Sequence, residues 1–164
     1  MKKILIPIIF LLSVSVSNAQ GYRQAIGIRG GLSSGFEYRF YTDDANSYKI
    51  LLSARDRGLQ IHGLKEFHRY DLFDFSDQIV FFYGGGVHVG YQRWDVVHYD
   101  YLTRWYSTKT SLIAGLDGLA GLEYVFYEAP ISIGLEVKPY FDLFGREVFH
   151  VQLFDFAFTV KYLF

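Results

Sequence analysis

The stretch that decides the fold is FHVQLFDFAFTVKYLF, residues 149–164. From Phe154 to Phe164 every even position holds a large apolar side chain, while the odd positions include Asp155 and Lys161. A period of two residues predicts a β-strand with one apolar face and one mixed face. The sequence ends on the last aromatic residue of this strand, whereas a turn and further chain would be expected to follow it in a soluble sandwich.

The first twenty residues have the pattern of a processing segment. Two lysines come first, an apolar run follows from Ile4 to Leu12, and small residues occupy positions 17–19. We therefore expect a signal peptide of residues 1–19, cleaved after Ala19, and one exported domain of residues 20–164. The apolar run is shorter than the roughly 20 residues that a membrane-spanning helix needs.

Composition narrows the class of protein. The chain is 51% hydrophobic and 20% aromatic, yet its formal net charge is only -1. A near-neutral chain offers no clustered basic stripe, so we expect no nucleic-acid partner. The absence of cysteine excludes a disulfide framework, a lipoprotein anchor and a thiolate metal site.

The period of two residues recurs along the whole mature chain. Lipid offers no partner for an open sheet edge, so strands with an apolar outer face and a polar inner face must close into a barrel. We therefore predict an all-β fold, an eight-stranded antiparallel up-and-down transmembrane β-barrel. Eight strands leave an interior that side chains fill, which argues against a porin-like channel. The segments begin near Gln24, Phe36, Tyr48, Leu59, Ile79, Leu112, Ile131 and Phe154.

The sequence makes specific predictions about the backbone at two positions, Gly58 and Pro139. Gly58 follows Arg57 in a tight turn and is expected to supply the positive φ angle that such hairpins require. Pro139 comes late in its strand and lacks an N–H donor. We therefore expect Pro139 at a bulge or near the rim of the barrel.

Four short motifs resemble those of a family of small outer-membrane β-barrel proteins. In size and strand number the protein is also similar to barrels of the OmpA and OmpX type. The resemblance covers nearly the whole mature chain and implies a protein of the outer membrane, but its motifs include no catalytic residue. In one departure, the tight turns near Ser33 and Gly58 would face outward, where such barrels usually have long loops. The motifs are AIGIRGG at 25–31, GLAGLEY at 118–124, LEVKP at 135–139 and KYLF at 161–164.

The end of the chain resembles the C-terminal signature of bacterial outer-membrane barrels. The resemblance implies two partners, the lipid of the outer membrane and the barrel-assembly machinery that reads this segment during insertion. We expect Phe164 to matter more for assembly than for the stability of the finished barrel. The signature residues are Phe158, Val160, Tyr162 and Phe164.

The inward-facing positions carry an unusual number of charges of both signs. Buried charges persist only when they are paired and hydrogen-bonded, so we expect an ion-pair network that plugs the lumen. A selective path for protons or solutes is the alternative. The positions of the turns predict three directly opposed pairs. These pairs are Arg29 with Glu37, Lys49 with Glu66, and Lys138 with Asp155.

Two histidines, His62 and His88, lie on the inward faces of neighbouring predicted strands and could bind a metal ion together. No third ligand occurs at a diagnostic spacing, and zinc requires one. We therefore expect lumen histidines without a metal, and no cofactor. The run Gly84–Gly86 lacks the helix and lysine that follow a phosphate-binding loop.

The segment WDVVHYDYLTRWYSTK, residues 94–109, is expected to be an extracellular loop. If the strands continue past the membrane as a ribbon, its aromatic residues form an interfacial girdle. Exposed aromatics would also suit adhesion or ligand binding. An enzyme would use Ser107 as nucleophile, His98 as base and an aspartate to orient it, although the spacing does not match the His-Xaa-Ser pattern associated with barrel lipid deacylases. The loop aromatics are Trp94, Tyr99, Tyr101, Trp105 and Tyr106.

These observations favour a non-enzymatic integral outer-membrane barrel with a structural, adhesive or assembly-partner role. The alternative is an outer-leaflet lipid-modifying hydrolase that uses residues 94–109. A soluble periplasmic barrel for an apolar ligand would need polar outward faces, which this chain lacks.

Overall fold

The computed structural model describes residues 22–55, 57–99, 104–145 and 149–164. The expected signal peptide, residues 1–19, lies outside the described residues, as does Tyr101. None of the described residues belongs to a helix long and apolar enough to cross a membrane. The strands are β1 (Gln24–Gly31), β2 (Ser34–Asp43), β3 (Asn46–Arg55), β4 (Gly58–Arg69), β5 (Ile79–Tyr99), β6 (Arg104–Val125), β7 (Ile131–Val137), β8 (Tyr140–Phe144), β9 (His150–Gln152) and β10 (Phe156–Leu163).

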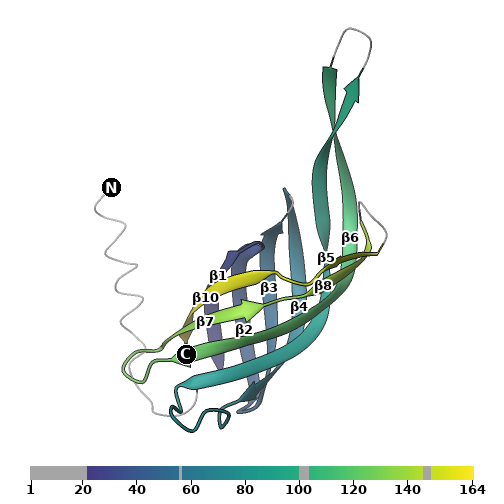
Figure 1. Cartoon of the computed structure of the whole chain (residues 1–164). Coiled ribbons are helices and arrows are strands. Elements are labelled where there is room, and N and C mark those ends of the chain that lie inside the picture. Colours follow the sequence, from purple (N-terminus) through teal and green to yellow (C-terminus); the bar gives the residue numbers. More distant parts are fainter. Residues whose placement is uncertain (1–21, 56, 100–103, 146–148) are drawn as a thin grey trace, which may run out of the picture.

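These strands form one closed antiparallel ring (Figure 1). Each strand from β1 to β6 pairs with the next in sequence, β6 pairs with β7 and β8, and β10 returns to pair with β1. Strands β5 and β6 continue beyond the rim as a long two-stranded ribbon. The predicted eight-stranded up-and-down barrel is confirmed. β7 and β8 together form one strand of the barrel, as do β9 and β10, so the ten strands occupy eight positions around the ring.

The two extra strands arise from two interruptions, one between β7 and β8 and one between β9 and β10. β7 and β8 share one register against β6, in which Ala120 faces Val137 and Asp117 faces Tyr140. They are therefore two parts of one barrel strand. Pro139 lies in the interruption, where its carbonyl accepts a hydrogen bond from the Gly118 N–H at 2.7 Å. On the other side of this break the register shifts by one residue, since Val137 faces Phe156 whereas Tyr140 faces Gln152. The missing proline donor therefore falls at a bulge, as predicted.

The turn between β1 and β2 is one residue earlier than predicted. Arg29 faces Gly35, and Glu37 faces Gly27 instead of Arg29. The Ser34 hydroxyl bonds the backbone of Gly31 and closes the turn. Ser33 in this turn is buried in the lumen, where its N–H donates a hydrogen bond to Asp155.

The turn between β3 and β4 also differs from the prediction. The residue with positive φ is Arg57, at 54°, and no described glycine has a positive φ. Gly58 instead pairs with Arg55, where an added Cβ would overlap the Tyr91 carbonyl oxygen of β5. Glycine is therefore required here for the close approach of two strands and not for the turn.

Burial in this barrel is inverted relative to a soluble protein. The exposed set contains 38 large apolar or aromatic side chains, whereas ten hydrophobic residues are buried among the described residues. Leu64, Phe82 and Leu119 form a small apolar cluster inside. Most of the other buried residues are polar or charged, so the interior is the part of the fold most capable of specific chemistry.

Candidate functional site

The barrel interior holds a network of charged side chains. Six basic and seven acidic side chains are buried among the described residues, so the interior carries one excess formal negative charge when its histidines are neutral. The basic residues are Arg29, Arg39, Lys49, Arg55, Lys138 and Lys161, and the acidic residues are Glu37, Glu66, Asp117, Glu123, Glu136, Asp142 and Asp155.

Lys49 is the centre of the glutamate-rich part of this network. Its Nζ lies 2.9 Å from Glu136, 3.0 Å from Glu66 and 3.3 Å from Glu37. The Lys49 side chain has no exposed surface. A buried ammonium among three carboxylates compensates charges that would otherwise be strongly destabilising.

Arg39 and Lys161 complete the glutamate-rich part. Arg39 contacts Glu66 at 2.6 Å and Glu123 at 2.7 Å, and Lys161 contacts Glu123 at 3.1 Å. The ring of Phe82 lies beneath the cations of Arg39, Lys49 and Lys161, at 5.1, 5.7 and 5.6 Å from its centroid. The aromatic face therefore adds cation–π attraction to these buried cations.

Arg29 joins the glutamate-rich part to the aspartate-rich part. Its Nε lies 2.6 Å from Glu136, and its Nη2 lies 3.3 Å from Asp155. The same guanidinium donates to the carbonyl and hydroxyl of Ser33, and the Ser33 N–H donates to Asp155 at 3.2 Å. These bonds hold the β1–β2 turn inside the barrel.

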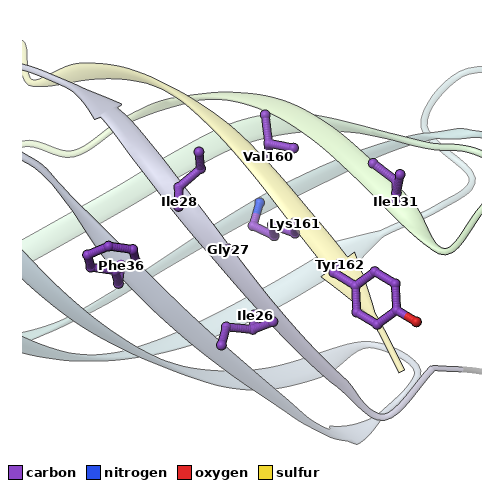
Figure 2. Close-up of a pocket in the computed structure, with 8 residues that line it drawn as sticks. All are labelled: Ile26, Gly27, Ile28, Phe36, Ile131, Val160, Lys161 and Tyr162. Carbon is purple, nitrogen blue, oxygen red and sulfur yellow. The ribbon is translucent and has the colours of Figure 1, made fainter. Parts of the chain in front are cut away.

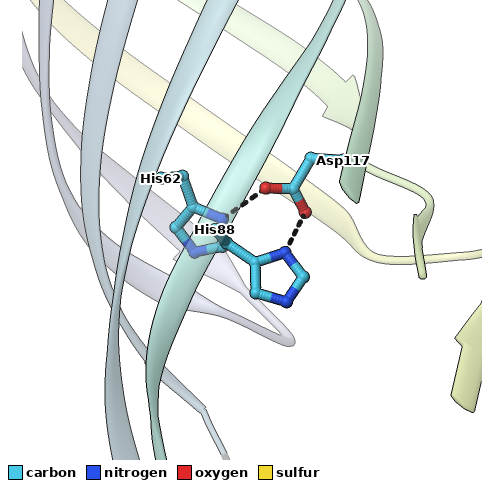
Figure 3. Close-up of side chains that lie close together, drawn as sticks. All are labelled: His62, His88 and Asp117. Atoms are coloured by element: carbon cyan, nitrogen blue, oxygen red, sulfur yellow. Dashed lines mark hydrogen bonds and ion pairs between the residues drawn. The ribbon is translucent and has the colours of Figure 1, made fainter. Parts of the chain in front are cut away.

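Asp117 is the centre of the aspartate-rich part. Its Oδ2 lies 2.7 Å from His62 Nδ1, and its Oδ1 lies 3.1 Å from His88 Nδ1 (Figure 3). The two histidines come from β4 and β5, where they face each other across the ladder. Sequence spacing alone supplied no third ligand for these histidines, but the register brings Asp117 to them from β6.

His88 lies between two carboxylates. Its Nδ1 is 3.1 Å from Asp117 Oδ1, and its Nε2 is 2.8 Å from Asp142 Oδ1. A carboxylate only accepts hydrogen bonds and a neutral imidazole has a single N–H, so both contacts are satisfied when both ring nitrogens carry a proton. One positive charge at His88 also offsets the excess negative charge of the interior.

The three predicted ion pairs have different outcomes. The opposition of Arg29 and Glu37 is wrong, because the earlier turn shifts the register and gives Arg29 to Glu136 and Asp155. Glu66 faces Ser47 instead of Lys49, for the same reason at the β3–β4 turn, yet Lys49 reaches Glu66 diagonally. Lys138 and Asp155 do meet, at 3.5 Å between Nζ and Oδ2.

Beyond the rim, the β5–β6 ribbon carries the loop residues. His98 Nε2 lies 2.9 Å from Ser107 Oγ, and the His98 ring stacks on Trp105 with centroids 4.1 Å apart. Trp105 is exposed, as are Tyr99 and Tyr106, whereas Trp94 is half-buried.

The base of the ribbon is tied to the β3–β4 turn. Asp95 accepts a hydrogen bond from Thr108 at 2.8 Å and pairs with Arg57. These two contacts, the Thr108 hydrogen bond first, hold the pKa of the Asp95 carboxyl below its usual range. Asp95 is thus engaged away from His98, and the orienting aspartate of a triad is absent from the described part of the ribbon.

The C-terminal signature residues lie on the outer wall. Phe158, Val160 and Phe164 are exposed, and Tyr162 is half-buried beside the Phe164 ring. The backbone of Phe164 exchanges two hydrogen bonds of 2.9 Å with Gln24, at the seam between the first and last strands. The last residue therefore closes the barrel with its backbone and leaves its side chain outside.

Comparison with known proteins supports the fold. No protein-family model matches the sequence, and no curated protein matches it. Among solved structures, the chain is similar to the N-terminal β-barrel domain of Pseudomonas aeruginosa OprF, with a TM-score of 0.50 and 12% sequence identity. The match covers 88% of this chain and 100% of that domain. At this identity the similarity concerns the barrel fold alone.

Proposed function

We propose that this protein is a non-enzymatic integral barrel of the outer membrane, with an interior closed by ion pairs and a structural, adhesive or assembly-partner role. The observation that carries the proposal is the inverted distribution of side chains. Large apolar side chains cover the outside of the ring, and charged side chains fill the inside. Lipid satisfies such an outer wall, whereas water does not.

The outer wall is apolar even where it is hollowed. A shallow hollow of about 380 Å³ lies over β1, β2, β7 and β10 (Figure 2). The side chains of Ile26, Ile28, Phe36 and Val160 surround Gly27 at this place. A soluble protein rarely exposes so continuous an apolar surface, which supports contact with acyl chains.

The interior supports a plug and not a pore. Each of the six buried basic side chains lies within 3.5 Å of at least one buried carboxylate. Side chains fill the interior of an eight-stranded barrel. Conduction would require these pairs to separate without water to solvate them, which costs several kcal/mol per ion.

Fractionation and conductance together test the proposal. The protein should be recovered with outer membranes, and unheated samples should migrate differently from boiled ones in SDS gels. In planar bilayers the purified barrel should produce no stable conductance steps. Recovery from the soluble periplasmic fraction would overturn the membrane assignment, and reproducible single-channel currents would overturn the plug.

The second candidate is an outer-leaflet lipid hydrolase, favoured by the 2.9 Å hydrogen bond between His98 and Ser107. A serine bonded to an imidazole is the arrangement in which the imidazole accepts the hydroxyl proton during nucleophilic attack. In its favour, the pair lies beyond the rim, in the part of the barrel expected to reach lipid headgroups.

Lipid analysis separates the two candidates. Mass spectra of lipid A and phospholipids should be identical in cells that carry the wild type, Ser107→Ala or His98→Gln. Thr108→Ala is the matched control, because it changes a neighbouring hydroxyl on the opposite face of the ribbon. Loss of a deacylated lipid species in the Ser107 and His98 variants alone would establish the hydrolase.

A further inference from the structure

The barrel interior gathers two imidazoles and one carboxylate from three successive strands. His62 of β4 and His88 of β5 face each other, with ring centroids 5.4 Å apart, and Asp117 of β6 lies beside them. Glycine makes room for this arrangement, since an added Cβ at Gly115, which faces His88, would lie 2.6 Å from the imidazole.

The donor atoms of this cluster are close enough for one ion. One ligand atom from each of His62, His88 and Asp117 lies within 4.8 Å of the other two. Both imidazoles point their Nδ1 atoms at the Asp117 carboxylate, at 2.7 and 3.1 Å (Figure 3). Donor atoms around a tetrahedral zinc ion are about 3.3 Å apart, given bonds of about 2.0 Å. The two Nδ1–carboxylate distances are therefore within about 0.6 Å of the spacing that a tetrahedral ion requires.

The outer nitrogens of both histidines already have the partners that metal ligands require. His62 Nε2 lies 2.9 Å from Ser53 Oγ, and His88 Nε2 lies 2.8 Å from Asp142 Oδ1. A histidine that binds a metal through one nitrogen donates the N–H of the other to a hydroxyl, carbonyl or carboxylate, which fixes the ring. Here both Nδ1 atoms face the centre while both Nε2 atoms are held from behind.

The surrounding charges tolerate a cation. The buried interior has seven carboxylates and six basic side chains among the described residues. With one proton charge on His88 it is neutral, and a divalent ion that displaces the Nδ1 proton of His88 leaves a net charge of only +1. The nearest ammonium, Lys138 Nζ, lies 3.5 Å from Asp117 and also 3.5 Å from Asp155. Lys138 therefore keeps one carboxylate if an ion takes the other.

We propose that His62, His88 and Asp117 bind one divalent transition-metal ion of the Zn²⁺ class. Imidazole nitrogen with a single carboxylate suits zinc, nickel or copper, whereas calcium and magnesium require mostly oxygen ligands. Three protein ligands leave a fourth position open, as in sites that exchange a ligand or release their ion. The site is independent of the membrane location proposed above.

The ion would enter from the end of the barrel that carries the β5–β6 ribbon. Arg55 and Asp142 lie toward that end, and their side chains keep 6% and 5% of their surface exposed. His62, His88 and Asp117 behind them have none. Asp142 thus combines two roles, since it lies toward the entrance and forms a hydrogen bond with His88 Nε2.

Metal titration of the full mature chain, folded in detergent, tests the proposal. Titration calorimetry with ZnCl₂ should give one ion per barrel, and Co²⁺ should produce the intense visible absorption of a tetrahedral nitrogen and oxygen site. Asp117→Asn and His62→Gln should each weaken zinc binding at least tenfold. Ser53→Ala, which leaves all three ligands in place, should weaken it roughly tenfold through the His62 ring.

Two controls separate this site from other histidines. His68→Gln removes another buried histidine of β4, and the double variant His98→Gln with His150→Gln removes the remaining two. Both should bind zinc as the wild type does. Folding of every variant is checked by its shift in unheated SDS gels, and the wild-type cobalt spectrum decides the matter if a ligand variant does not fold. Absence of tetrahedral cobalt absorption in the wild type, or equal zinc affinity in wild type and folded ligand variants, would overturn the proposal.

Discussion

Removal of the Lys49 ammonium tests the interior network most directly. In Lys49→Met the side-chain length is kept, but Glu37, Glu66 and Glu136 lose the cation that lies 2.9 to 3.3 Å from each of them. Breaking a buried ion pair by removing one partner costs about 3–5 kcal/mol, because the remaining charge stays buried without compensation. Arg29 and Arg39 still contact Glu136 and Glu66, which keeps the expected loss within that range.

The measurement is reversible urea unfolding of the barrel in detergent or lipid vesicles, followed by tryptophan fluorescence. The matched control is Lys65→Met on the outer face of β4, which should not destabilise the barrel, because an apolar side chain is tolerated at least as well as a lysine on a lipid-facing wall. Adding Glu37→Gln to Lys49→Met removes one of the stranded charges. The double variant should therefore lose less than the sum of the two single variants.

Two results would refute this reasoning. One is a loss below about 1 kcal/mol for Lys49→Met, which would mean that water or counterions reach the network. The other is strict additivity of Lys49→Met and Glu37→Gln, which would mean that the two charges do not interact. If Lys49→Met does not fold alone, recovery of folding in the double variant supports the same coupling, and failure of both contradicts it.

Three further predictions concern Gly58 in the barrel wall, Phe164 where the first and last strands pair, and Asp95 in the β5–β6 ribbon. In the same urea assay, Gly58→Ala should destabilise the barrel by about 1–3 kcal/mol, because the added Cβ would overlap the Tyr91 carbonyl. The control is Gly63→Ala in the same strand, which should be nearly neutral because no atom lies within 4 Å of the new Cβ. Phe164→Lys keeps the backbone hydrogen bonds to Gln24. It should reduce the amount of protein inserted in cells and leave the urea midpoint of the inserted fraction nearly unchanged. Insertion at the wild-type level would contradict the C-terminal signature. In carboxyl NMR titrations the pKa of Asp95 should lie below its unfolded value, so its contribution to stability is present above about pH 4 and lost as pH falls through the lowered pKa. Thr108→Val should raise that pKa more than Arg57→Gln does, and the reverse order would show that the ion pair dominates.

Much of the fold follows from local pattern alone. The period of two residues assigns each side chain to a face, and the structure buries Arg29, Glu37, Lys49, Glu66, Lys138 and Asp155 as parity predicts. Parity is a property of a single strand, so no knowledge of its neighbours is needed. The number of barrel strands likewise follows from the local alternation, and the break at Pro139 follows from its missing N–H donor.

Which charges meet was decided by the closed barrel. A turn displaced by one residue shifts the facing position by two, which keeps the faces but changes the partners, as at Arg29. Contacts across the lumen are further removed from sequence, since Arg29 reaches Glu136 at a separation of 107 residues.

The same distinction applies to the histidine cluster. The sequence determined that His62, His88 and Asp117 all point inward. Only the register of β4, β5 and β6 placed the Asp117 carboxylate between two imidazoles and put Ser53 and Asp142 behind them. The physical reason is that alternation fixes the direction of a side chain, whereas its height in the barrel depends on how every preceding strand is paired.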